Sequence, residues 1–154
     1  MNLYLVQHAE ATPESEDPER RLSEPGWAGI RKMARFAADR LEIRVPRILH
    51  SGKARARETA EVLAEALRPQ LGVEAADGLD PLADPRVWAG RAADSRENAM
   101  LVGHLPHLSK LASLLLCGDE DKPVVAFQMG GIAYLRRDEA GRWSIGWLVV
   151  PGIL

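Results

Sequence analysis

The chain has 154 residues, 20 basic and 22 acidic, and a formal net charge of −2. This length fits one domain with a single core, so we predict one domain over residues 1–154. Acidic and basic residues are interspersed, which argues against a nucleic-acid or membrane-surface partner held by bulk electrostatics, so any substrate must be recognised locally.

Short apolar runs alternate with helical patterns over the first half of the chain. The first run, residues 3–6, predicts a buried strand. A helix is expected next, because apolar residues recur at helical spacing from Trp27 to Leu41 after the N-cap candidate Ser23. The pattern also predicts a strand over 47–50 and a helix over 56–67, which stops before Pro69. A further strand near Val73 is expected from a weaker pattern.

The second half continues this alternation and then changes period. Asp84 and Pro85 predict a helix start that runs through Trp88, and Leu105-Pro106 predicts another before Gly118. Residues 99–102 predict a buried strand between these helices, and 132–136 with 143–149 predict a closing hairpin. The expected fold class is therefore α/β, a three-layer αβα sandwich with a mostly parallel central sheet and a C-terminal antiparallel hairpin.

Three predicted strands end in chemically capable side chains. His8 follows the first strand, Arg55 opens the helix after the second, and His104 follows the strand at 99–102. Ligands of open α/β sheets bind outside the carboxyl ends of the strands, so these residues are expected to meet there. Taken alone, each histidine could be a hydrogen-bonded core or loop residue, and Arg55 and Arg57 could be a solvated helix face paired with acidic neighbours.

Four motifs extend this pattern over nearly the whole chain. They are strand-Gln-His8-Ala-Glu near the N-terminus, Arg20-Arg-Leu-Ser-Glu-Pro-Gly26, Ser51-Gly-Lys-Ala-Arg55-Ala-Arg-Glu-Thr59 and Val102-Gly-His104-Leu-Pro106. In order and spacing they resemble the histidine phosphatase superfamily, which is phosphoglycerate mutase-like, in its small phosphohistidine phosphatase branch. The chain departs from the family at one place, because the usual Arg-His-Gly is Gln7-His8-Ala9.

The resemblance implies a phosphatase with His8 as nucleophile and a phosphohistidine enzyme intermediate. It also implies that Arg55 and His104 are catalytic and bind the phosphoryl group, with Arg20 at the pocket mouth. Gln7 can still donate to a phosphoryl oxygen, although an amide binds an anion less strongly than a guanidinium. A phosphate or sulfate anion should therefore fit the pocket, and no cofactor is required.

The substrate and the proton donor remain open at this stage. The favoured substrate is phosphohistidine on a signalling protein such as a histidine phosphotransfer domain. The alternatives are a small phosphate ester, with Asp80 or Asp84 as general acid, and a non-catalytic module that binds phosphate or a phosphoprotein because Gln7 replaces the usual arginine. Asp84 is also an N-cap candidate, and Arg20 is equally compatible with a surface salt bridge.

Other observations concern metal and location. His104 and His107 have the three-residue spacing of a metal pair, but no Cys cluster or His-Glu motif supplies further ligands, so no metal is expected. The single Cys117 cannot form an intramolecular disulfide. Because the first strand starts within two residues of Met1, we expect no signal peptide or membrane span and a cytoplasmic protein.

Overall fold

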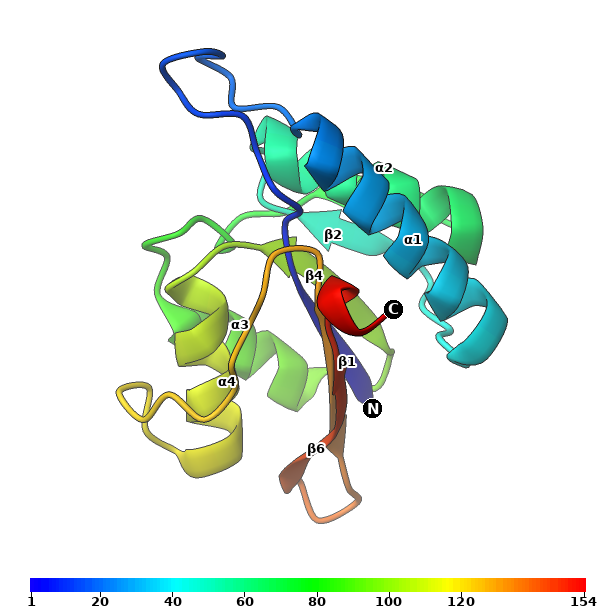
Figure 1. Cartoon of the computed structure of the whole chain (residues 1–154). Coiled ribbons are helices and arrows are strands. Elements are labelled where there is room, and N and C mark those ends of the chain that lie inside the picture. The colour runs from blue at the N-terminus through cyan, green and yellow to red at the C-terminus, as the bar shows by residue number, and fades with distance from the viewer.

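The computed structural model describes all residues from Met1 to Leu154. Strands and helices alternate up to the fourth helix, and a hairpin and a short 3-10 helix follow (Figure 1). The elements are β1 (Asn2–Gln7), α1 (Glu24–Arg40), β2 (Ile48–His50), α2 (Ala54–Leu67), β3 (Val73–Ala75), α3 (Pro85–Asp94), β4 (Ala99–Gly103), α4 (His107–Cys117), β5 (Ile132–Arg137), β6 (Trp143–Val149) and η1 (Pro151–Ile153). None of the helices is both long and apolar enough to cross a membrane.

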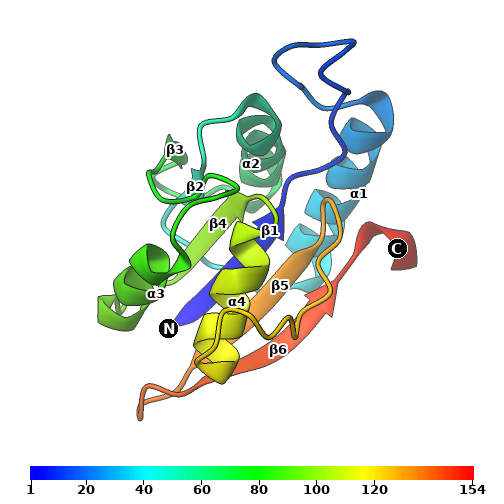
Figure 2. The same ribbon diagram turned by 90° about the vertical axis from the view of Figure 1, so that its left-hand side faces the viewer.

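The six strands form one sheet in the order β3-β2-β4-β1-β5-β6, as Figure 2 shows. β3, β2, β4 and β1 are parallel, whereas β5 pairs antiparallel with both β1 and β6. The predicted parallel sheet with a C-terminal hairpin is therefore confirmed. β4 lies between β1 and β2, so the carboxyl ends of these three strands meet at one edge of the sheet.

Helices cover both faces of the sheet (Figures 1 and 2). Because side chains alternate along a strand, Tyr4 and Val6 pack with α1 and α2, while Leu3 and Leu5 pack with α3 and α4. All four side chains are buried. The result is the expected three-layer αβα sandwich, with one apolar cluster on each side of the sheet.

Local signals in the sequence set most helix ends. The Ser23 hydroxyl accepts a hydrogen bond from the Gly26 N–H at the start of α1, as its N-cap pattern predicts. Gly118 ends α4 in the left-handed conformation, with φ of 71°. The start of α4 differs slightly from expectation: Pro106 is the N-cap residue rather than the first helical residue, and the helix begins at His107.

Candidate active site

His8 and His104 lie side by side because their strands are neighbours. Gln7 at the end of β1 stands opposite Gly103 at the end of β4, so the next residue of each strand leaves the sheet at the same place. The His8 N–H donates to the Gly103 carbonyl at 3.0 Å, and the two imidazole centroids are 5.1 Å apart. The predicted meeting of these histidines at the carboxyl edge is present.

The hydrogen bonding of His8 defines its tautomer. Nδ1 lies 2.7 Å from the carbonyl oxygen of Ala9, which can only accept, so Nδ1 carries the hydrogen and Nε2 holds a free lone pair. Burial is the main cause that lowers the pKa of His8 to about 4; the Ala9 hydrogen bond opposes it, and the positive charges of Arg55 and Arg20 act with it. His8 is therefore a neutral ring with an available lone pair at neutral pH.

His104 is also neutral and is held by a residue of the neighbouring strand. Burial, followed by the adjacent His8 and Arg55, lowers the pKa of His104 to about 3. Its Nε2 lies 2.6 Å from the hydroxyl oxygen of Ser51, which directly follows β2. Ser51 was not among the site residues predicted from the sequence, and its only signal was its place at the head of the Ser51 to Thr59 motif.

Arg55 lies in the first turn of α2, where backbone N–H groups also favour an anion. Its Nε is buried without a hydrogen-bond partner. No carboxylate forms an ion pair with Arg55 or with its neighbours Arg20 and Lys53. Positive charge beside His8 is thus left uncompensated, and a guanidinium is suited to grip a phosphoryl group through two parallel hydrogen bonds.

The structure separates Arg20 from its basic neighbours. Arg21 pairs with Asp17 at 3.1 Å, and Arg57 lies 3.6 Å from Glu61 on the solvated face of α2, as predicted for Arg57. Arg20 has no carboxylate partner. It lines a cavity of about 510 Å³ whose other charged residues are Glu14, Glu19, Lys53, Arg55 and Arg57. Its backbone has a φ of 49°, and its Nε donates to the Thr12 carbonyl. The pocket interpretation of Arg20 is therefore favoured over the salt-bridge interpretation.

Two buried residues of α2 form hydrogen bonds with the backbone of the loop between β1 and α1. The Thr59 hydroxyl accepts from the Ala9 N–H at 3.0 Å and donates to the Arg55 carbonyl at 2.7 Å. The Glu58 carboxylate accepts from the Leu22 N–H at 2.9 Å. These contacts tie the segment after His8 and the segment after Arg20 to the helix that carries Arg55. Sequence reasoning assigned neither residue a role, although Thr59 is the last residue of the motif.

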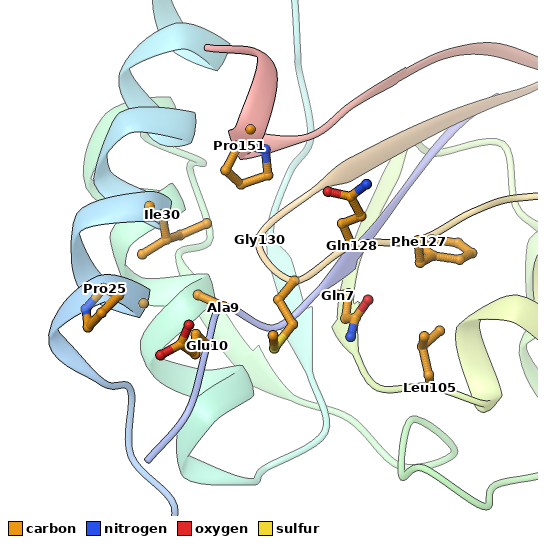
Figure 3. Close-up of a pocket in the computed structure, with 14 residues that line it drawn as sticks. Gln7, Ala9, Glu10, Pro25, Ile30, Leu105, Phe127, Gln128, Gly130 and Pro151 are labelled. Carbon is orange, nitrogen blue, oxygen red and sulfur yellow. The ribbon is translucent and has the colours of Figure 1, made fainter. Parts of the chain in front are cut away.

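Gln7 lies at the boundary between the histidines and a second cavity. Its Oε1 is buried without a hydrogen-bond partner, and its side chain lines a cavity of about 470 Å³ beside Leu105 and Phe127 (Figure 3). An amide in this place offers less to an anion than the arginine that the motif otherwise has, because it carries no charge.

The two candidate acids interact with residues other than His8 and His104. Asp84 caps α3 by accepting from the Arg86 N–H at 3.0 Å and pairs with the Arg86 guanidinium at 2.9 Å, so its N-cap interpretation is confirmed. Asp80 is exposed. Burial lowers the pKa of His107, and the negative charges of both carboxylates partly oppose this lowering. Neither is among the groups that shift the pKa of His8 or His104.

The site offers no grouping suited to a metal ion. No three or more His, Cys, Asp or Glu side chains gather in the structure in a way that could hold one. What the site offers instead is a neutral nucleophilic imidazole, a second imidazole and a free guanidinium at one sheet edge. This combination suits chemistry on an anion that carries its own electrophilic centre, such as a phosphoryl group.

The chain is similar in sequence and in structure to known phosphohistidine phosphatases. No family model matches the chain. The phosphohistidine phosphatase SixA of Escherichia coli K12 is 27% identical over 156 residues, which cover 98% of this chain and 94% of SixA. The structure of the protein histidine phosphatase SixA complexed with tungstate superposes with a TM-score of 0.86 at 23% identity, covering 99% of both chains. A protein of Agrobacterium tumefaciens described as a phosphohistidine phosphatase SixA gives a TM-score of 0.78 at 28% identity, covering 97% of this chain and 98% of that one.

Proposed function

We propose that this chain is a SixA-like member of the histidine phosphatase superfamily, a phosphohistidine phosphatase that acts on a phosphorylated signalling protein. The observation that carries the proposal is the His8 ring, which donates from Nδ1 to the Ala9 carbonyl and leaves Nε2 free. The ring lies beside His104 and near the unpaired Arg55, where a phosphoryl group can be held for attack.

In the first step, the lone pair of His8 Nε2 attacks phosphorus and the P–N bond of the substrate breaks. The substrate imidazole leaves as a neutral ring when its other nitrogen already carries a proton, so no separate acid is needed. His8 then holds the phosphoryl group on Nε2 and keeps its hydrogen on Nδ1. The Ala9 carbonyl stabilises the positive charge that this ring acquires, because it accepts from Nδ1.

In the second step, water attacks phosphorus and the P–Nε2 bond of His8 breaks. Both hydrogens of the water leave with the phosphate, which is released as H2PO4⁻, and His8 returns to its neutral form with its hydrogen on Nδ1. Both steps pass through a loose transition state with charge on the phosphoryl oxygens. Arg55 supplies two parallel donors to these oxygens, while Arg20 adds positive charge at the mouth.

His104 can contribute a further donor to the phosphoryl group, because its ring lies beside His8. Its neutral ring has one N–H, and when this is on Nε2 it can donate to a phosphoryl oxygen while the ring stays beside the Ser51 hydroxyl. An uncharged donor leaves the phosphoryl group bound less tightly in the ground state than an imidazolium would. This arrangement suits release of phosphate after each cycle.

The positions of the acidic residues favour a phosphohistidine over a phosphate ester. An ester oxygen needs a proton as it leaves, and a general acid must lie within hydrogen-bond reach of it. Asp84 is occupied by the α3 cap and Arg86, and Asp80 neighbours His107 rather than His8. The tungstate bound by SixA further supports an oxyanion site of this type in the family.

Trapping the phosphoenzyme tests the proposal. The protein is mixed with a phosphorylated histidine phosphotransfer domain or with p-nitrophenyl phosphate, quenched rapidly and analysed for acid-labile, alkali-stable phosphate. We expect label on the wild type, none on His8→Ala, and faster phosphate release from the phosphorylated domain. Faster release from the ester would indicate a small-molecule phosphatase. Absence of label and of release from both donors would indicate a module that only binds phosphate.

A further inference from the structure

A groove adjoins the catalytic histidines on the side of Gln7. We call it the Gln7 groove; it has a volume of about 470 Å³. Figure 3 shows Glu10 and Pro25 on one side of it and Gln7, Leu105 and Phe127 on the other. Its lining comes from five places: the end of β1 with the residues after it, the start of α1, the loop between β4 and α4, the segment before β5, and η1. They are Gln7, Ala9, Glu10, Pro25, Gly26, Gly29, Ile30, Leu105, Phe127, Gln128, Met129, Gly130, Pro151 and Gly152.

The groove differs in charge from the cavity that Arg55 lines. That cavity has four basic residues, Arg20, Lys53, Arg55 and Arg57, against two acidic ones, Glu14 and Glu19, so its net positive charge suits an anion. The Gln7 groove has no lysine or arginine in its lining, and its single charged residue is Glu10. An anionic group would be repelled there, whereas a neutral or cationic group is favoured.

Apolar side chains stand exposed at the rim of the groove. Leu105 is 39% exposed and Met129 is 46% exposed, and they lie near the half-buried Phe127. Exposed apolar groups of this kind, next to polar ones, mark surfaces that bind other molecules. Methionine adapts to partners of different shape because its side chain is flexible.

Hydrogen bonds fix both walls of the groove relative to His8. The Gly130 N–H donates to the backbone carbonyls of Gln7 and His8, at 2.9 and 3.2 Å. On the opposite wall, the Glu10 carboxylate accepts from the Ser23 hydroxyl at 2.8 Å, which fixes it at the start of α1. A molecule seated in the groove is therefore placed at a defined position relative to a phosphoryl group on His8.

We propose that the Gln7 groove binds the polypeptide that flanks the phosphohistidine of a phosphorylated protein. An apolar side chain of the partner packs against Leu105 and Met129, and a cationic side chain lies opposite Glu10. The inference rests on the proposed function and deepens it. The groove is not lined by His8, Arg55 or His104, so it lies outside the phosphoryl site, and its volume of about 470 Å³ leaves room for side chains of a partner polypeptide.

The test compares a large donor with a small one that shares its P–N bond. The donors are a phosphorylated histidine phosphotransfer domain and phosphoramidate, and the variants are Met129→Asp and Glu10→Lys. Leu71→Asp is the matched control, because Leu71 is 58% exposed in the loop before β3, at the opposite edge of the sheet. For both groove variants we expect kcat/KM with the domain to fall at least about tenfold more than with phosphoramidate, and for Leu71→Asp we expect no such difference.

Equal losses with the two donors, or no loss with either, would overturn the inference. A matching loss with p-nitrophenyl phosphate would also overturn it, because the groove would then hold the leaving group of a small ester. Binding of the phosphorylated domain to His8→Ala, measured by calorimetry with and without Met129→Asp, separates this inference from the proposed function. Unchanged affinity contradicts the groove, whereas absence of phosphate release by the wild-type protein contradicts the phosphatase.

Discussion

The hydroxyl oxygen of Ser51 lies 2.6 Å from Nε2 of His104, although 53 residues separate them in the chain. The contact exists because β4 pairs with both β1 and β2, which brings the ends of these three strands together. Ser51 thus orients the ring that stands beside His8. We infer that Ser51 is a positioning residue, which keeps the His104 ring oriented toward the phosphoryl site during catalysis.

Removal of the Ser51 hydroxyl should lower turnover modestly. A neutral hydrogen bond contributes about 0.5–1.5 kcal/mol, so Ser51→Ala should reduce kcat by about two- to twelvefold. Ser51→Thr retains the hydroxyl and should restore most of the rate. Initial rates with a phosphorylated domain measure the effect, and thermal unfolding checks that both variants are folded. A loss with Ser51→Ala that Ser51→Thr fails to restore would contradict the positioning role.

The low pKa of His8 predicts a flat pH profile on the acidic side of neutrality. Nucleophilic attack needs the neutral ring, and the pKa of His8 is lowered to about 4, so the reactive form persists well below pH 6.5. We expect kcat/KM, which reports the free enzyme, to remain constant from pH 7.5 to about 5.5 and to fall only nearer pH 4. Short assays corrected for spontaneous loss of phosphate measure it. A midpoint near 6.5 would show that His8 titrates as an exposed histidine does.

Much of the fold could be predicted from local patterns. The runs at 3–6 and 99–102 are buried on both sides and read clearly as central parallel strands. The apolar pattern that predicts β3 was weak, because β3 is a three-residue edge strand that is half-exposed at Val73 and exposed beyond it. The Asp84 cap was visible because Asp followed by Pro is a strong helix-start signal.

Only the site residues that follow a strand end could be predicted from the sequence. His8, Arg55 and His104 each follow a strand, so their meeting followed from sheet topology. The partners of these residues were not visible, because the Ser51 contact depends on β4 lying between β1 and β2. The direction of the Gln7 side chain and the fastening of Ala9 by Thr59 also depend on long-range packing that no local pattern encodes.

Gly26 is required by a close backbone approach at the entrance to the groove. A Cβ at this position would lie 2.0 Å from the carbonyl oxygen of Glu10, which also accepts from the Ser23 N–H. Backbone cannot yield as a side chain can, so Gly26→Ala should destabilise the fold by about 1–3 kcal/mol.

A second glycine in the same helix provides the control for this prediction. A Cβ at Gly29 would meet nothing within 4 Å, so Gly29→Ala should stabilise the protein by up to about 1 kcal/mol through its better helix propensity. Urea unfolding of both variants measures the difference. Equal effects would show that propensity rather than the Glu10 contact governs Gly26.

Replacing Gln7 with the arginine usual in this motif should strengthen phosphate binding. Hydrogen bonds to charged groups contribute about 1.5–3 kcal/mol against about 1 for neutral ones, so Gln7→Arg should lower the Kd for inorganic phosphate by about two- to thirtyfold. Gln7→Glu is the opposite control and should weaken binding by charge repulsion. Calorimetry measures both. Unchanged affinity in the two variants would show that this side chain faces only the groove and not the phosphoryl site.

His107 is fully buried at the first position of α4, and neither of its ring nitrogens has a hydrogen-bond partner. Burying an unpaired polar group costs about 1–3 kcal/mol, so His107→Leu should leave stability unchanged or raise it by up to that amount. His107→Asn keeps an unpaired polar group there and should bring no such gain. Thermal unfolding at neutral pH measures both, alongside phosphate release. The charged or titratable neighbours of His107 are Asp80, Asp84 and His104. If His107→Leu lost phosphate release without losing stability, the ring would instead belong to a proton path toward His104.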